Sequence, residues 1–273
     1  MPRPRLTRVN QAVPQTVGPL GRALAAAFTE GDFLSDGLAH SVSSDTAQQD
    51  KWTAARLEYK TAQAILELEA WVAIPADAPF PDDEVFPGAV MLLAPPGVEA
   101  GDGNAKNAWY AAYKEATPAE TQKIYDQLLT ELADLENAAV PGGAKATYHI
   151  DFIGTPPVAR KQGLASALLR HVLDRADRDK VIATLVTQTA GNEAYYTRFG
   201  FKTQLQRQLT VNGETGTIWY MVYTPGTQPS YPKDEEEEED DDDAEAQAFV
   251  ARTGTVGHDH GHDHDHSHGG GCC

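Results

Sequence analysis

The stretch that decides the fold reads Thr155-Pro156-Pro157-Val158-Ala159-Arg160-Lys161-Gln162-Gly163-Leu164-Ala165. Residues 145–155 alternate apolar and polar positions, which predicts a strand, and residues 163–177 repeat apolar residues at helical spacing, which predicts an amphipathic helix. A helix that begins at Gly163 directs free N–H groups and its positive dipole end at the loop, where two basic residues add charge. The stretch therefore predicts either an anion-binding loop or an ordinary strand-to-helix turn with solvated basic residues.

The elements after this stretch predict a mixed sheet. Residues 181–189 are apolar and β-branched almost throughout, which is typical of a buried strand. A short helix over 192–199 follows, and then a hairpin whose strands, 201–211 and 217–223, are joined around Asn212-Gly213. Strand, helix and strand in succession predict a parallel pair with a right-handed crossover, and the hairpin adds antiparallel strands.

The first half of the chain predicts helices and strands by composition and spacing. The expected elements are a strand over 6–16, a helix over 17–29, a loop over 31–48, a helix over 50–68, strands over 69–75 and 88–94, and a helical region over 104–137 that breaks at Pro118. Thr117-Pro118-Ala119-Glu120 is a helix start, with a capping threonine, a proline at the first helical position and a glutamate that closes a capping box.

The net charge of −18 is concentrated in the last part of the chain. Residues 234–273 hold fourteen acidic residues and one basic residue, ten of the acids in an unbroken run, so the first 233 residues carry a net charge of −5. A like-charge run of this length does not bury apolar surface. We therefore expect a folded domain over 1–228 and a disordered acidic and histidine-rich tail over 229–273, with the boundary in the proline-rich segment 225–232.

Composition also limits the partners. The chain has no basic face for nucleic acid, no apolar run near the roughly 18 residues of a membrane span, and no apolar segment at its N-terminus for secretion. Both cysteines, Cys272 and Cys273, lie at the C-terminal end, so the domain has no disulfide. We expect a cytoplasmic protein, with the nucleus as the alternative compartment, and neither a nucleic-acid nor a membrane partner.

Two motifs resemble the GNAT superfamily of N-acetyltransferases. The first is arginine or glutamine, two variable residues, glycine, one variable residue and glycine or alanine, matched from Arg160 to Ala165. The second is an asparagine before a short helix with a tyrosine, followed by Gly-Phe, matched by Asn192, Tyr196 and Gly200-Phe201. The close match covers residues 145–225, and the Pro-Pro-Gly at 95–97 looks like fungal members. The resemblance implies an α/β fold with a mixed, mostly antiparallel twisted sheet, a splayed central parallel pair and flanking helices.

The resemblance also implies acetyl-CoA as the co-substrate and assigns residues to it. Backbone amides of the loop and first helical turn would hold the pyrophosphate: Arg160, Lys161, Gln162, Gly163, Leu164, Ala165 and Ser166. Backbone groups of the preceding strand would pair with the pantetheine arm: Phe152, Ile153, Gly154 and Thr155. The parallel strands would splay near Gly154 and Gln188, and Asn192 would bond the pantetheine or the nearby backbone.

The resemblance implies direct acetyl transfer to an amine. Tyr196 would protonate the leaving thiolate, with the adjacent Tyr195 as the alternative, and a backbone N–H near Ile153 would stabilise the oxyanion. His149 and Asp151 lie two residues apart on one strand and should face the same side. Either is a candidate general base, and the alternative is a structural hydrogen-bonding role.

The tail carries six histidines that alternate with small or acidic residues: His258, His260, His262, His264, His266 and His268. Neutral imidazoles suit Zn, Ni and Cu, so a flexible metal-binding tail is one interpretation, and a solubilising low-complexity extension is the other. The terminal Gly-Gly-Gly-Cys-Cys resembles the prenylated end of Rab-type small GTPases, but no GTPase domain is visible, so we do not expect lipid anchoring.

The leading prediction is therefore an N-acetyltransferase that moves an acetyl group from acetyl-CoA to a primary amine of a small molecule or peptide. The loops at 31–50, 76–87 and 212–217 should set the acceptor. The alternatives are a metal-binding protein that uses its histidine tail on an inactive GNAT scaffold, and an adaptor that binds CoA without catalysis.

Overall fold

The computed structural model describes residues 3–28, 32–76, 86–98 and 108–226. The division of the chain at residue 228 stays a prediction, because residues 227–273 lie outside the described part.

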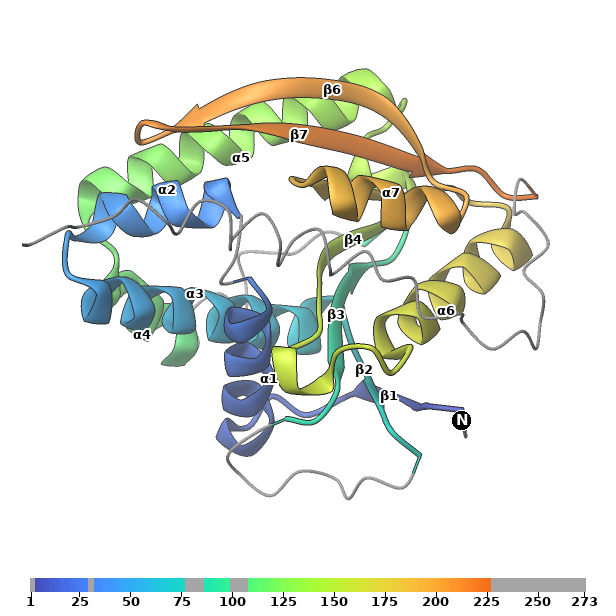
Figure 1. The fold of residues 1–273 in the computed structure, drawn as a ribbon, viewed down its shortest axis with the longest axis horizontal. Helices are drawn as coiled ribbons and strands as arrows, with labels where there is room; N and C mark the ends of the chain where they lie inside the picture. The colour runs from blue at the N-terminus through green and yellow to red at the C-terminus, as the bar shows by residue number, and fades with distance from the viewer. Residues whose placement is uncertain (1–2, 29–31, 77–85, 99–107, 227–273) are drawn as a thin grey trace, which may run out of the picture. The chain divides into compact units, whose positions relative to one another are not determined.

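A seven-stranded mixed sheet forms the centre of the fold (Figure 1). Its order is β1-β2-β3-β4-β5-β7-β6, and only the β4–β5 pair is parallel. The strands are β1 Arg5–Val9, β2 Glu69–Ile74, β3 Ala89–Ala94, β4 Tyr148–Gly154, β5 Ala183–Thr187, β6 Lys202–Val211 and β7 Glu214–Tyr223. The predicted mixed sheet with a central parallel pair is confirmed.

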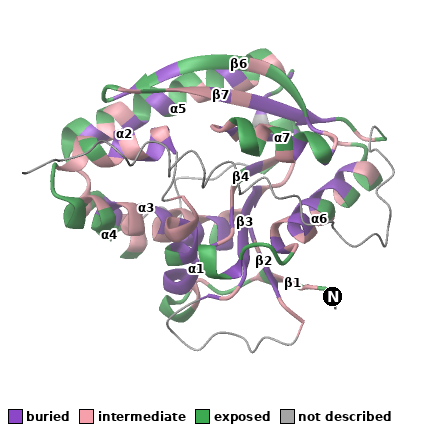
Figure 2. Ribbon diagram, viewed as in Figure 1, coloured by how far each residue is buried: buried purple, intermediate pink, exposed green. Residues whose placement is uncertain are grey.

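Helices cover both faces of this sheet. They are α1 Pro14–Ala27, α2 Phe33–Val42, α3 Thr46–Glu67, α4 Ala108–Ala116, α5 Ala119–Ala139, α6 Leu164–Asp179 and α7 Ala190–Arg198. The alternation of β2 separates the two faces: Val72 joins the apolar cluster with α1 and α3, whereas the neighbouring Trp71 ring lies 4.2 Å from His171 of α6. We call these the α1/α3 face and the α6 face. Figure 2 shows that β3, between them, is buried along almost its whole length.

A second apolar cluster joins α2 and α5 to the β6–β7 hairpin. In Figure 1, α5 and α2 run beside this hairpin. A β-carbon on Gly216 of β7 would come within 2.2 Å of the Phe33 ring, so only glycine admits α2 this closely. The hairpin turns at Asn212 and Gly213 with φ of 48° and 88°, the left-handed pair that a two-residue turn requires, as the sequence predicts.

Two predicted elements are wrong. Residues 31–48, expected to be a loop, contain α2, whose helix is capped by Asp32 and packs through Leu34 and Leu38 on the hairpin. The first strand ends at Val9 rather than near residue 16, because Pro14 begins α1 instead of closing the strand. The other predicted helices and strands are confirmed with boundaries that differ by a few residues. The predicted cap of α5 is wrong, because its N-cap residue is Pro118 and the Thr117 hydroxyl donates to the Tyr113 carbonyl instead.

Candidate active site

The parallel strands β4 and β5 diverge. They pair only from Tyr148–Ala183 to Ile150–Leu185; β4 then continues beside β3 alone, and β5 beside β7 alone. A β-bulge at Asp151 marks the divergence, since Ile150 pairs with Leu93 and Phe152 with Leu92. The predicted splay is confirmed, and it begins before Gly154. The β5 side of the last four residues of β4 is thus left without a strand partner.

The loop after β4 presents backbone to this opening. A 3-10 turn, Pro157–Ala159, leads to Lys161 and Gly163, which both have left-handed backbone with φ of 60° and 66°. Helix α6 begins at the next residue, and no side chain among the described residues caps it. Left-handed residues in a turn before a helix N-terminus direct successive N–H groups into one concavity, which suits an anion.

Arg160 is already hydrogen-bonded within the loop, through its backbone and its side chain. The amide of Arg160 donates to the Pro157 carbonyl at 3.3 Å, and its Nε donates to the Thr155 carbonyl at 3.4 Å. The Thr155 hydroxyl is buried and has no hydrogen-bond partner among the described residues. The loop therefore combines fixed geometry with polar groups that a ligand can satisfy.

The two tyrosines of α7 have different surroundings. The Tyr195 hydroxyl lies 3.0 Å from the Ser166 hydroxyl in the first turn of α6, which ties the two helices together. Tyr196 is 8% exposed and packs edge-on against Phe201, and burial, with a smaller effect of Tyr195, raises its pKa. Tyr196 therefore stays protonated at neutral pH. Asn192 is exposed in the first turn of α7, and its backbone N–H donates to the capping hydroxyl of Thr189 at 3.1 Å.

His149 and Asp151 both meet helices of the α1/α3 face. His149 Nδ1 lies 3.0 Å from the Thr184 hydroxyl, and its Nε2 lies 3.5 Å from a carboxylate oxygen of Glu136 on α5. Asp151 lies 3.7 Å from the ammonium group of Lys60 on α3, and the pKa of Lys60 is raised, first by Tyr125 and then by Asp151. The two candidate bases thus have opposite partners, a carboxylate for His149 and a cation for Asp151.

Glu136 is a site residue that the sequence reasoning missed. Burial raises its pKa, while His149 lowers it and Asp151 raises it further. The signal was present in the sequence, because Glu136 continues the apolar stripe of Leu128 and Leu132 at a spacing of four residues. A carboxylate on the buried face of an amphipathic helix needs a partner in the core.

The histidines predicted to bind metal, His258 to His268, lie outside the described residues. Within the described part, no group of three or more His, Cys, Asp or Glu side chains could hold a metal ion. In the same part of the chain, no helix is both long and apolar enough to cross a membrane.

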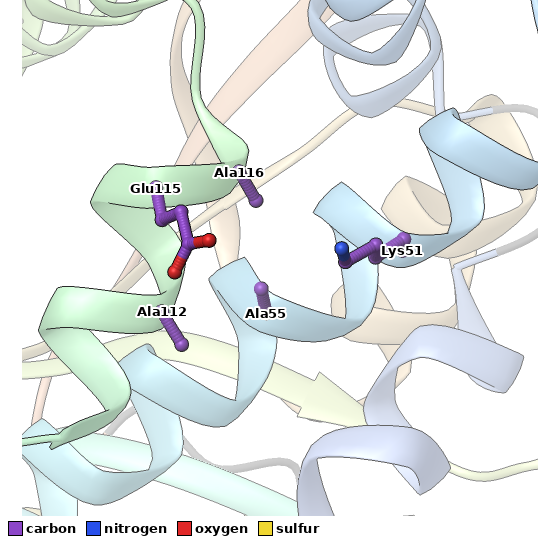
Figure 3. A pocket seen from close by; sticks show the side chains of 5 residues that line it. All are labelled: Lys51, Ala55, Ala112, Glu115 and Ala116. Atoms are coloured by element: carbon purple, nitrogen blue, oxygen red, sulfur yellow. The ribbon is translucent and has the colours of Figure 1, made fainter.

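A shallow hollow of about 190 Å³ lies between α3 and α4 (Figure 3). Its walls are mostly alanine, and they come from Lys51, Ala55, Ala112, Glu115 and Ala116. None of the residues expected to bind acetyl-CoA or to act in catalysis lines this hollow, so it is separate from the candidate site.

Comparison with known proteins agrees with this fold. The family model described as an acetyltransferase (GNAT) domain matches residues 106–218. The structure of a histone acetyltransferase HPA2 and related acetyltransferase from Corynebacterium glutamicum superimposes with a TM-score of 0.52 at 16% identity, over 84% of this chain and 99% of that one. Arylalkylamine N-acetyltransferase 2 from Aedes aegypti covers 81% of this chain and 98% of its own at 14% identity, with a TM-score of 0.47. No protein with a curated description matches the sequence.

The divergent parallel pair and the helix start without a side-chain cap together suit a site for an anionic ligand. The family model places a GNAT acetyltransferase domain at residues 106–218, and this match supports an acyl-CoA-dependent N-acetyltransferase. The likeness to solved structures at this identity concerns the fold alone, and the resemblance to fungal members stays a prediction.

Proposed function

We propose that the chain acetylates a primary amine, on a small molecule or a peptide, by direct attack of the amine on acetyl-CoA. The observation that carries this proposal is the opening between β4 and β5 beside the uncapped start of α6. Acetyl-CoA supplies an acetyl group activated as a thioester. The chain's own residues hold it, orient the amine and move the protons.

The loop amides from Lys161 to Ser166 hold the pyrophosphate, and the backbone from Phe152 to Thr155 pairs with the pantetheine arm. The Arg160 amide already donates to the Pro157 carbonyl, so Arg160 contributes its charge rather than its N–H group. The left-handed Lys161 and Gly163 support the first role, because they turn N–H groups toward one point. The β4 segment without a β5 partner supports the second, because its free edge can add a strand-like ligand. Asn192 lies in the first turn of α7 and bonds the same arm.

Tyr196 is the proton donor to the leaving thiolate. Its raised pKa supports this role, since the phenol keeps its proton until a strong base forms next to it. Tyr195 is the weaker candidate, because its hydroxyl already bonds Ser166. We assign Tyr195 to positioning α7 against α6.

His149 is the general base, and Glu136 is its positioning residue. With Nδ1 donating to Thr184, Nε2 carries the lone pair that accepts the proton of the incoming ammonium, directly or through one water. The Glu136 carboxylate, 3.5 Å away, stabilises the imidazolium that forms. Asp151 is held by Lys60 and is better suited to orienting the acceptor side of the site.

The test combines calorimetric binding of acetyl-CoA with acetyl transfer to polyamines, aminoglycosides, amino acids and peptide N-termini. Binding together with turnover of one class supports the proposal. Binding without turnover of any class favours a CoA-binding adaptor, and a chain that does not bind acetyl-CoA refutes the proposal altogether.

A further inference from the structure

Arg56 is a buried cation on α3 that the acetyl-transfer machinery does not use. Arg56 is 5% exposed. Its guanidinium carbon lies 5.2 Å from the centre of the Trp52 ring and 6.0 Å from the centre of the Phe152 ring. A guanidinium carries five N–H donors. Among the described residues it makes one hydrogen bond, from Nη2 to the Ser35 hydroxyl at 2.9 Å, and its buried Nε has no acceptor.

The charge of Arg56 is only indirectly balanced. No carboxylate of the described residues forms an ion pair with it; the Ser35 hydroxyl that accepts from it donates to Asp32 at 2.6 Å. One turn further along α3, by contrast, Lys60 has a direct partner in Asp151. A buried charge with unmet donors is costly, and an anionic ligand would satisfy it.

The position of Arg56 places it at the opening between the parallel strands. Phe152, which it faces, lies on the part of β4 that has left β5. Ser35, which it bonds, follows Leu34, whose amide donates at 3.3 Å to the side chain of Gln188, the residue after β5. Arg56 is thus linked to both walls of the opening, on the α1/α3 face where His149 also lies.

We infer that Arg56 binds an anionic group of the acceptor, so the acceptor is an amine that also carries a carboxylate, as an amino acid does. This inference rests on the proposed function and narrows its substrate class. The planar guanidinium matches a carboxylate with two parallel hydrogen bonds, and the flanking rings of Trp52 and Phe152 keep water away from that pair. With the carboxylate held there, the amine can point to the thioester and to His149.

The experiment compares kcat/KM for amino acids with kcat/KM for the amines that remain when their α-carboxylate is removed. The full chain is assayed as wild type, Arg56→Met, Arg56→Lys and, as a matched control, Arg207→Met on the exposed side of β6. We expect the wild type to prefer carboxylate-bearing acceptors, and Arg56→Met to reduce that preference about 10- to 100-fold, the range for losing a charge-assisted hydrogen bond. The preference of Arg56→Lys should lie between those of the wild type and Arg56→Met, because lysine keeps the positive charge but cannot form two parallel hydrogen bonds to a carboxylate.

Circular dichroism and the Kd of acetyl-CoA establish that the variants are folded, since the cofactor loop lies at the start of α6. If Arg56→Met does not fold, the inference is tested by Arg56→Lys and by the preference of the wild type for carboxylate-bearing acceptors. Equal use of both acceptor sets by the wild type, or an unchanged preference in folded Arg56 variants, overturns the inference and leaves the proposed function standing. A chain that acetylates no amine refutes the proposed function, and this inference falls with it.

Discussion

Tyr195 and Tyr196 are adjacent on α7, yet their hydroxyl groups have different surroundings. Tyr195 faces α6, where its hydroxyl hydrogen-bonds the Ser166 hydroxyl, whereas Tyr196 packs beside Phe201. The family spacing favours Tyr196, and helical periodicity by itself does not choose between them. The hydrogen bond of Tyr195 supplies the physical reason to separate their roles.

Tyr196→Phe should lower kcat by about 10²- to 10⁴-fold while the Kd of acetyl-CoA stays unchanged, because only the proton donor is lost. Tyr195→Phe is the matched control; it removes the bond to Ser166 and should cost about 1 kcal/mol of stability with little change in kcat. Steady-state kinetics and urea unfolding measure the two effects. If Tyr195→Phe lowers kcat more than Tyr196→Phe does, Tyr195 is the proton donor and Tyr196 is not.

His149→Gln should lower kcat by about 10²-fold or more at neutral pH, because the ammonium then has no base. The loss should shrink as pH approaches the pKa of the acceptor amine, since alkaline solution removes the proton instead. The pH dependence of kcat/KM for this variant, beside that of Asp151→Asn, measures the effect. A profile in which only Asp151→Asn shows this pattern would make Asp151 the base.

At the scale of elements, α6 connects the cofactor loop to the sheet through a polar network. Arg175 donates to Glu69 of β2 at 2.5 and 3.1 Å, and the Trp71 indole donates to the same carboxylate at 2.7 Å. The Arg175 guanidinium also lies 4.8 Å from the Tyr148 ring on β4. These contacts fix the C-terminal half of α6 relative to β2 and β4, and the helix carries that placement to its start, where we propose the anion site.

His171 of α6, whose ring packs against Trp71 of β2, makes the contact between α6 and the sheet sensitive to acid. Burial, followed by Arg175, lowers the pKa of His171, and its Nε2 has no partner within the described part of the chain. The unfolded chain therefore takes up a proton at a higher pH than the folded one does. The ordinary pKa of a histidine is about 6.5. The contribution of His171 to the free energy of unfolding is fully present above that pH and is lost as the pH falls below it.

The free energy of unfolding should therefore decrease between pH 7 and pH 5 more steeply in the wild type than in His171→Gln, which cannot take up that proton. Urea unfolding at a series of pH values measures both slopes. Histidines outside the core titrate equally in both proteins and cancel in the comparison. If the free energy of unfolding depends on pH equally in the wild type and in His171→Gln, protonation of His171 does not destabilise the fold.

For the whole molecule, the second half of the chain could be predicted well from the sequence. The loop, α6 and the parallel pair follow from local patterns: a glycine before a helix, an apolar stripe and a β-branched run. Helix α2 could not be predicted, because its ten residues gain their stability from contact with a hairpin about 170 residues away in sequence. Tertiary contact, rather than local propensity, decides that segment.

The same reason explains the site residues that sequence analysis missed. Glu136 and Arg56 lie on helices that the sequence predicts, yet their importance depends on which strand each helix covers. His149 and Asp151 were expected to face one side, and the contacts with α3 and α5 place them together there. Their roles stay predictions, as do the backbone contacts to acetyl-CoA.

Hydrogen exchange of the full chain, with and without acetyl-CoA, tests the central claim most directly. We predict slower exchange for the amides from Phe152 to Thr155 and from Lys161 to Ser166, because the co-substrate would occupy the free edge of β4 and the start of α6. The amides of the β6–β7 hairpin, which already pair with one another, serve as the internal reference. Binding of acetyl-CoA that leaves exchange in these two segments unchanged would contradict the account.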